Sequence, residues 1–291
     1  MSALNPSTPA FQPRTFSYAG PMPEEEIFVD VWDYNFHTEI RKISEMLETY
    51  PYIAMDTEFP GIVLKPVGDL VDLQYQMIRF NVDVLKIIQV GITLADENGN
   101  YPQGICTWQF NFKFDVDKDT YAEDSIKLLR RSGIRFDHLK ENGIEMKDFA
   151  EYFLTSGAVL NPDIKWVTFH SGYDFGYLLK VLTCQQLPES EPEFMETLKL
   201  YFPVFYDLKM MIKKFDHLRG SLNRLADEMQ VRRIGQAHQA GSDSFVTMAT
   251  FFKVRERMFA SDVPKEFECC LFGLGAGEQD KDYYSDKAIS A

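Results

Sequence analysis

The stretch YIAMDTEFPG, residues 52–61, places two carboxylates, Asp56 and Glu58, inside an apolar run. In a β-strand, residues i and i+2 point to the same face of the sheet. Two like charges on one part-buried face repel each other and lose hydration. We therefore expect a strand whose acids are held by a partner of opposite charge, for which a divalent metal ion is the simplest candidate.

An ordinary alternative exists for this pair. About one D-x-E is expected by chance in a chain of this length at usual acidic frequencies. Both carboxylates would then be solvated at the edge of a strand. The apolar neighbours argue against that environment, since Ile53, Ala54 and Met55 precede the pair and Phe59 and Pro60 follow it. The pair alone thus indicates a site but does not define its chemistry.

Two later segments combine acids with helix starts. Asp174, in WVTFHSGYDFGYLL, follows a predicted buried strand and stands where a helix begins. His238 and Asp243, in IGQAHQAGSDSFVTM, are five residues apart before another helical segment. Each acid has a simpler alternative role, because an acid in the first turn stabilises the helix dipole by roughly 0.3–1 kcal/mol. A lone histidine is most often a surface-loop residue.

The charge balance limits how this chain can bind nucleic acid. The net charge is −14 and the pI is near 4.8. A protein that grips nucleic acid through many phosphates needs many Lys and Arg side chains, so such a grip is disfavoured. An enzyme that holds only a few nucleotides, while metal ions supply the positive charge, is not excluded.

Cysteine usage and hydropathy indicate the compartment. The four cysteines, Cys106, Cys184, Cys269 and Cys270, form no C-x-x-C motif. They predict free thiols in a reducing compartment and no structural zinc. The start of the chain lacks the pattern of a secretory signal, and no apolar run reaches the length of a membrane span. We expect a soluble, intracellular protein with no membrane partner.

The chain is expected to form one domain, residues 27–275, between a flexible N-terminal arm, 1–26, and a polar C-terminal tail, 276–291. Five strands are predicted at YIAMDTEF, LKIIQVGITLAD, ICTWQFNFKF, IKWVTFH and VFYDLKMM, the last being a strand or strand-to-helix junction. A helix is predicted before the first strand, and helices alternate with strands after the third. This order indicates an α/β or α+β domain of three layers with a mixed sheet.

Taken together, these motifs resemble a known signature. D-x-E on a first strand, a later Asp that opens a helix and H-x-x-x-x-D near the end are typical of the His-containing branch of the DEDD exonuclease superfamily. The longer strings MDTEFPG, NVDVLKIIQVGIT, TWQFNFKF, FHSGYDFGYLLK and HQAGSDS look more specifically like the Pop-type (Caf-one) poly(A) deadenylases, nuclease subunits of the Ccr-four–Not complex. The resemblance extends from about Val31 to Leu274.

Two departures from the family pattern concern the substrate mouth. The segment IVLKPVGDLVDLQYQ is a few residues shorter than in typical members, and Ser221 stands where relatives often carry glycine. The four acids and His238 are intact. The departures therefore bear on base preference more than on catalysis.

The resemblance implies a fold and an activity. The fold would be an α/β, ribonuclease-H-like three-layer domain with a five-stranded mixed sheet flanked by helices. The activity would be that of a 3′-to-5′ exoribonuclease that shortens mRNA poly(A) tails and releases 5′-AMP by two-metal-ion hydrolysis. The implied cofactors are two divalent ions, magnesium or manganese, which suit hard oxygen ligands.

Roles for the five residues follow as a hypothesis. Asp56 would bridge both ions, Glu58 and Asp174 would hold one ion each, directly or through water, and Asp243 would complete one ligand shell. His238 would accept a proton from the attacking water, since histidine titrates near neutrality. The metal ligands would thus be Asp56, Glu58, Asp174 and Asp243.

Three further residues are candidates for binding the terminal base. Phe59 lies beside the acids and could stack on the base, with a core aromatic as the alternative. His170 and Leu222 are weaker candidates for the same pocket.

The resemblance also implies partners and a compartment. They are poly(A) RNA, a helical domain of a Not-family scaffold protein, and a deadenylase of the endonuclease/exonuclease/phosphatase type. The expected compartment is the cytoplasm, with nuclear roles left open. Two alternatives remain: a catalytically weak adaptor subunit of the same complex, and a DEDD exonuclease that acts on other single-stranded nucleic acid.

Overall fold

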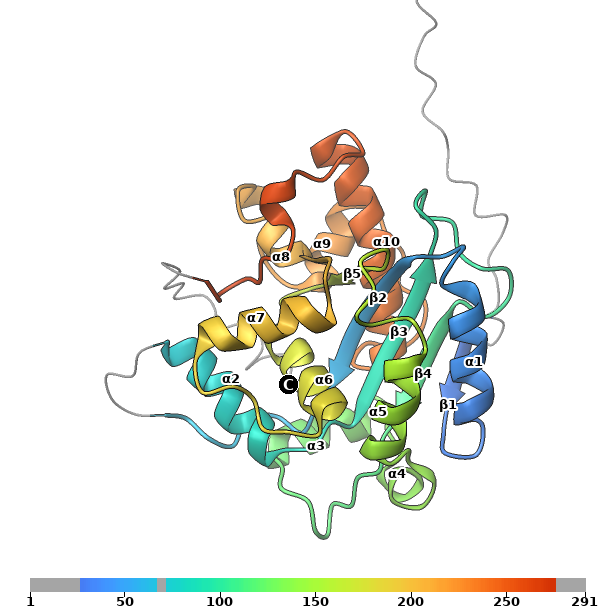
Figure 1. Ribbon diagram of the computed structural model, residues 1–291, viewed down its shortest axis with the longest axis vertical. Helices are drawn as coiled ribbons and strands as arrows, with labels where there is room; N and C mark the ends of the chain where they lie inside the picture. Colours follow the sequence, from blue (N-terminus) through green and yellow to red (C-terminus); the bar gives the residue numbers. More distant parts are fainter. Residues whose placement is uncertain (1–26, 67–71, 276–291) are drawn as a thin grey trace, which may run out of the picture.

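A computed structural model describes residues 27–66 and 72–275 of the chain, and Figure 1 shows how its elements are arranged. The predicted arm, 1–26, and the predicted tail, 276–291, lie outside the described residues. The described part is built on one mixed sheet with helices on both faces (Figure 1). No helix in these two ranges is long and apolar enough to cross a lipid bilayer.

Six strands form the sheet, in the order β1-β4-β3-β2-β5-β6. Their bounds are β1 Phe28–Val31, β2 Tyr52–Glu58, β3 Gln89–Ala95, β4 Thr107–Asn111, β5 Lys165–Thr168 and β6 Phe205–Asp207. The β2–β3 and β3–β4 pairs are antiparallel, and the other three pairs are parallel. The α/β class and the mixed sheet are confirmed.

The expected number of strands, five, is wrong by one. The additional strand is β1, which pairs in parallel with β4 at the edge of the sheet. It has four residues and lies between the predicted arm and the first predicted helix. A strand this short shows too little alternation to be recognised in the sequence, and its pairing depends on a strand almost 80 residues away.

The helices account for about half of the remaining described residues. They are α1 Phe36–Met46, α2 Leu73–Val84, α3 Glu123–Arg131, α4 Phe136–Asn142, α5 Met146–Thr155, α6 Gly172–Thr183, α7 Glu191–Tyr201, α8 Leu208–Met211, α9 Leu222–Glu228 and α10 Ala240–Phe259. Short 3₁₀ turns, η2 Asp216–Leu218 and η3 Lys265–Phe267, complete the set. In Figure 1, α10 lies behind the sheet, while α1, α5 and α6 lie in front of it.

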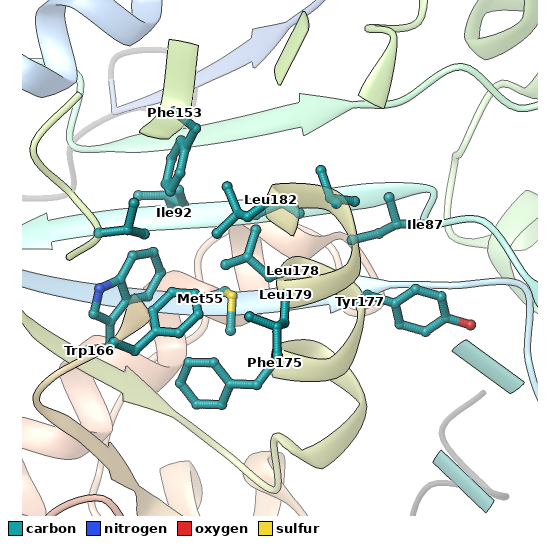
Figure 2. Packing of buried hydrophobic residues seen from close by; sticks show 14 of the residues in the cluster. Met55, Ile87, Ile92, Phe153, Trp166, Phe175, Tyr177, Leu178, Leu179 and Leu182 are labelled. Carbon is teal, nitrogen blue, oxygen red and sulfur yellow. The ribbon is translucent and has the colours of Figure 1, made fainter. Parts of the chain in front are cut away.

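Strand β2 separates two hydrophobic clusters. Its odd-numbered residues Ile53 and Met55 pack in the larger cluster with α1, α2, α5 and α6. Figure 2 shows Met55 among side chains of α6. The even-numbered residues Tyr52 and Ala54 pack in a second cluster with α10. Alternation along the strand therefore directs Asp56 and Glu58 to the α10 face.

The start of α10 lies directly on the sheet. Gly91 of β3 is paired with Asp56 of β2. A Cβ atom added at Gly91 would overlap the backbone carbonyl of Ala240, the first residue of α10. Because glycine leaves this space open, the first turn of the helix can approach the strand next to Asp56.

Candidate active site

Three carboxylates meet where α10 begins over β2. Asp56, Glu58 and Asp243 each place one oxygen within 4.8 Å of the other two. Glu58 is buried, and Asp56 and Asp243 are half-buried. Oxygens that bind one magnesium ion, each about 2.1 Å from it, lie at most about 4.2 Å apart. The three side chains are therefore close enough to share a divalent ion with at most a small inward movement.

Asp174 approaches β2 from the other side of the strand. It stands in the first turn of α6 and is 1% exposed. Its Oδ1 accepts hydrogen bonds from the backbone N–H of Thr57, at 3.1 Å, and from the Thr57 hydroxyl, at 2.6 Å. Pairing of β2 with β5 ends at Ala54, so Asp174 supplies an acceptor to β2 beyond the end of the ladder.

The four predicted acids are thus not equivalent in this structure. Asp56, Glu58 and Asp243 form the group of three, whereas Asp174 is fixed to the residue that lies between the first two. Thr57 connects Asp174 to the strand that contains Asp56 and Glu58. Asp174 itself does not belong to the group of carboxylates whose oxygens lie within 4.8 Å of one another.

His238 lies in the turn that precedes α10. Its backbone N–H donates to Oδ2 of Asp243 at 2.9 Å, so the H-x-x-x-x-D segment folds back on its own acid. The residue has φ +61°, in the left-handed region that non-glycine residues rarely adopt. His238 is thus tied through its backbone to Asp243, one of the three acids.

Phe59 and His170 are both buried against aromatic side chains. The Phe59 ring is 6% exposed and stacks against both Tyr173 and Tyr177 of α6, at 5.2 and 5.1 Å between ring centroids. This packing favours the alternative, a core aromatic. His170 is 3% exposed and packs edge-on against Phe272. Contact of either residue with a base stays a prediction.

Leu222, the third candidate, adjoins a residue that is linked to the acids. It is half-buried and is the first residue of α9. The next residue, Asn223, accepts a hydrogen bond from Arg233 at 2.6 Å, and Arg233 also donates to Asp243. The start of α9 is therefore connected to the acids by two hydrogen bonds.

Two glutamines that the sequence interpretation overlooked hold the first turn of α10. The Gln109 side-chain oxygen accepts from the N–H of Gly241 at 3.0 Å, and that of Gln89 accepts from the N–H of Ala240 at 3.4 Å. Both glutamines come from the sheet, so strand side chains satisfy donors that a helix terminus leaves unpaired. The sequence feature that could have identified Gln89 and Gln109 is a polar residue inside an otherwise apolar strand.

Gln239 ties the same turn to α3. Its side-chain oxygen accepts from Gln109 at 2.9 Å and from Gln89 at 3.3 Å. Its side-chain nitrogen donates to the carbonyl of Ser132, just after α3. The segment that contains His238 and Asp243 is consequently fixed both to the sheet and to α3.

Asp207 anchors the loop that leads to Asp174. It is fully buried at the end of β6, and its two oxygens accept from the backbone N–H groups of His170, Ser171, Lys209 and Phe272. Burial raises the pKa of this carboxyl, and the backbone donors partly oppose that rise. Ser171 immediately precedes α6, so Asp207 helps to position the helix start that carries Asp174.

The sequence has clear relatives. The model of the CAF1 family ribonuclease matches residues 31–153 and 158–251. A probable CCR4-associated factor 1 homolog 7 from Arabidopsis thaliana is 49% identical over 255 residues, 84% of this chain and 92% of the relative. The poly(A) ribonuclease pop2 of Schizosaccharomyces pombe is 47% identical over 250 residues, 85% of this chain and 75% of the relative.

Solved structures agree with the sequence relatives. The Mg²⁺- and Mn²⁺-bound form of S. pombe Pop2p matches with a TM-score of 0.83 and covers 85% of this chain and 99% of that one. Yeast CAF1, co-crystallized with the NOT1 MIF4G domain, matches with a TM-score of 0.74 at 30% identity, over 87% of this chain and 99% of that one. The ribonuclease-H-like fold expected from the sequence is confirmed. This chain belongs to the CAF1 family of ribonucleases.

Proposed function

We propose that this protein is a 3′-to-5′ exoribonuclease that shortens the poly(A) tails of mRNA and releases 5′-AMP. The observation that carries the proposal is the group of three carboxylates, Asp56, Glu58 and Asp243, at the meeting of β2 and α10. The match to pop2, a poly(A) ribonuclease, supports poly(A) as the substrate.

The carboxylate group fits two divalent cations, magnesium or manganese. Its donors are hard oxygens at the spacing such ions need, and the structure of the relative Pop2p carries Mg²⁺ and Mn²⁺. When bound, the ions supply the Lewis-acid chemistry that offsets the charge of the scissile phosphate.

The four acids would hold these ions in different ways. Asp56 would hold both ions, Glu58 would hold one ion, and Asp243 would complete one ligand shell. Asp174, whose Oδ1 accepts from Thr57, would hold the other ion, directly or through water.

His238 is the general base in this proposal. A water molecule near the terminal phosphodiester would give its proton to an imidazole nitrogen as it attacks. The hydrogen bond from the His238 backbone to Asp243 fixes the turn and keeps the backbone of the proposed base close to the proposed metal ligand. One nucleotide would leave the 3′ end in each cycle.

Recruitment by partners would compensate for weak binding of RNA. A chain of net charge −14 attracts a polyanion poorly beyond its metal site. We propose that a Not-family scaffold delivers the enzyme to mRNA, which is supported by the complex of yeast CAF1 with the NOT1 MIF4G domain. A deadenylase of the endonuclease/exonuclease/phosphatase type would join the same assembly. The proposed compartment is the cytoplasm, with nuclear roles left open.

A labelled RNA tests the proposal directly. A 5′-labelled RNA with an A tail is incubated with purified protein and magnesium or manganese, beside the double variant Asp56→Ala/Glu58→Ala. We expect a ladder that shortens from the 3′ end, stops near the tail boundary, and is absent in EDTA and in the variant.

The two alternatives give different results in that assay. Equal degradation of A-tailed RNA, other RNA and single-stranded DNA would identify an exonuclease of broader substrate range. An intact substrate with either metal, even after addition of a scaffold MIF4G domain, would identify an adaptor subunit and overturn the proposal.

A further inference from the structure

Arg233 lies in the segment between α9 and α10 and makes contacts in three directions. Its Nη2 donates to Oδ1 of Asp243 and to Oδ1 of Asn223, both at 2.6 Å. Its Nη1 donates to the Ser242 hydroxyl at 2.9 Å, and that hydroxyl in turn donates to the carbonyl of Ile234 at 2.8 Å. The guanidinium is thus held on several sides, and its side chain is 21% exposed.

These contacts determine how Asp243 is oriented. Arg233 engages one of its carboxylate oxygens, and the His238 backbone N–H engages the other. With both oxygens held, the side chain has little freedom to rotate away from Asp56 and Glu58. Each carboxylate oxygen has more than one acceptor site, so an ion can still bind on the side that faces the other two acids.

Two opposite effects on metal binding follow from this arrangement. The charge of Arg233 opposes the arrival of another cation beside Asp243. Its hydrogen bonds, however, keep Asp243 in place against the repulsion of Asp56 and Glu58. The guanidinium charge is partly exposed and therefore screened, whereas loss of a residue that orients a metal ligand typically weakens metal binding or activity 10–100-fold. Orientation should therefore outweigh repulsion.

We propose that Arg233 is a positioning residue that fixes Asp243 for divalent-ion binding and links the start of α9 to that ligand through Asn223. This inference rests on the metal site of the proposed function. It concerns how tightly the folded protein binds the ions, a property that can be measured without RNA.

The test measures Mn²⁺ binding to the full chain by calorimetry and by electron paramagnetic resonance of free Mn²⁺. We expect Arg233→Gln to weaken Mn²⁺ binding by about 10–100-fold. The matched control is Arg232→Gln, which removes the same charge from the neighbouring exposed position and should leave Mn²⁺ affinity unchanged. Equal effects of the two substitutions would mean that only net charge matters and would overturn the proposal.

Two more variants separate orientation from charge and from folding. Arg233→Lys keeps the charge but loses the planar fork that reaches several acceptors, so it should also weaken Mn²⁺ binding. Asn223→Ala removes one anchor of Arg233 and leaves its ion pair with Asp243, so a smaller loss in the same direction is expected. Both variants should keep the wild-type circular dichroism spectrum in EDTA. Tighter Mn²⁺ binding by Arg233→Gln would show that repulsion dominates and would overturn the proposal.

Turnover provides a readout that a general loss of structure would not give. If Arg233 acts through Asp243, high Mn²⁺ concentrations should restore most of the rate of Arg233→Gln. A rate that stays low while Mn²⁺ affinity is normal contradicts the inference. If wild-type protein itself binds no Mn²⁺, the proposed function fails. If wild type binds Mn²⁺ and Arg233→Gln binds it equally well, only the present inference fails.

Discussion

Thr57 donates two hydrogen bonds to one oxygen of Asp174, from its backbone N–H at 3.1 Å and from its hydroxyl at 2.6 Å. Thr57 lies between Asp56 and Glu58 in β2, and its side chain points to the opposite face of the strand. The fourth acid is therefore tied to the strand that carries the first two, without joining their face. A movement of α6 would be transmitted to β2 through these bonds.

Replacing Thr57 by valine tests this connection. Thr57→Val keeps the shape of the side chain and the backbone N–H but removes the hydroxyl that Asp174 accepts. Hydrogen bonds to charged groups contribute about 1.5–3 kcal/mol, so we expect a loss of this size in the free energy of unfolding and lower ribonuclease activity. Denaturant unfolding and the RNA assay measure the two effects. Thr57→Ser retains the hydroxyl and should stay close to wild type.

Substitution of Gly91 should displace the first turn of α10. The new methyl group of Gly91→Ala would overlap the backbone of Ala240, so the helix must move. Overpacking typically costs about 1–3 kcal/mol, and movement of α10 would also separate Asp243 from Asp56. Activity per folded molecule should fall sharply. Gly104→Ala controls for backbone strain away from the acids, because its Cβ would meet no atom within 4 Å while its φ of +80° disfavours alanine. Equal activity per folded molecule of the two variants would contradict the close-approach argument.

The strand that carries the first acids could be predicted because its signal is local. The apolar run YIAM indicates a buried strand, and the alternation of side chains along a strand gives Asp56 and Glu58 a shared face. The same alternation places Phe59 on the opposite face, where the structure shows it against two tyrosines. Its nearness to the acids in sequence suggested a substrate contact, whereas the period of two indicates the core.

Long-range contacts account for what the sequence did not predict. Gln89 and Ala240 are 151 residues apart, and Gln109 and Gly241 are 132 apart, yet both pairs form hydrogen bonds. Nothing in either segment alone specifies the other. Arg233 was overlooked for a related reason. An arginine beside a turn is common, and its partner Asn223 lies ten residues earlier, in α9.

The strand glutamines should be needed for a correctly placed α10. Gln109→Ala removes the acceptor for the Gly241 N–H and the donor to Gln239. Loss of a helix cap typically costs about 0.5–2 kcal/mol, so we expect a loss in that range in the free energy of unfolding, together with weaker Mn²⁺ binding. Thermal unfolding and calorimetry measure these changes. Gln103→Ala, at an exposed position, should change neither; matching results for both variants would show that Gln109 has no special role.

The three clustered carboxylates should lower the stability of the metal-free protein and enable it to bind metal. In EDTA they repel one another, so Asp56→Asn, which removes one charge, should raise the melting temperature of the metal-free protein. A ligand that binds only the folded state stabilises it by about 2.7 kcal/mol at 100 times its dissociation constant. Mn²⁺ should therefore raise the melting temperature of wild type much more than that of Asp56→Asn. Differential scanning calorimetry in EDTA and in Mn²⁺ measures both effects.

Asp163→Asn controls for the loss of one negative charge elsewhere, because Asp163 is exposed in the turn before β5. It should leave the metal-free melting temperature and the response to Mn²⁺ unchanged. If Asp56→Asn instead destabilises the metal-free protein, the carboxylates are not in net repulsion. Other partners of the carboxylates would then stabilise their positions by more than their mutual repulsion destabilises them. Relief of that repulsion would therefore contribute little to the free energy of metal binding.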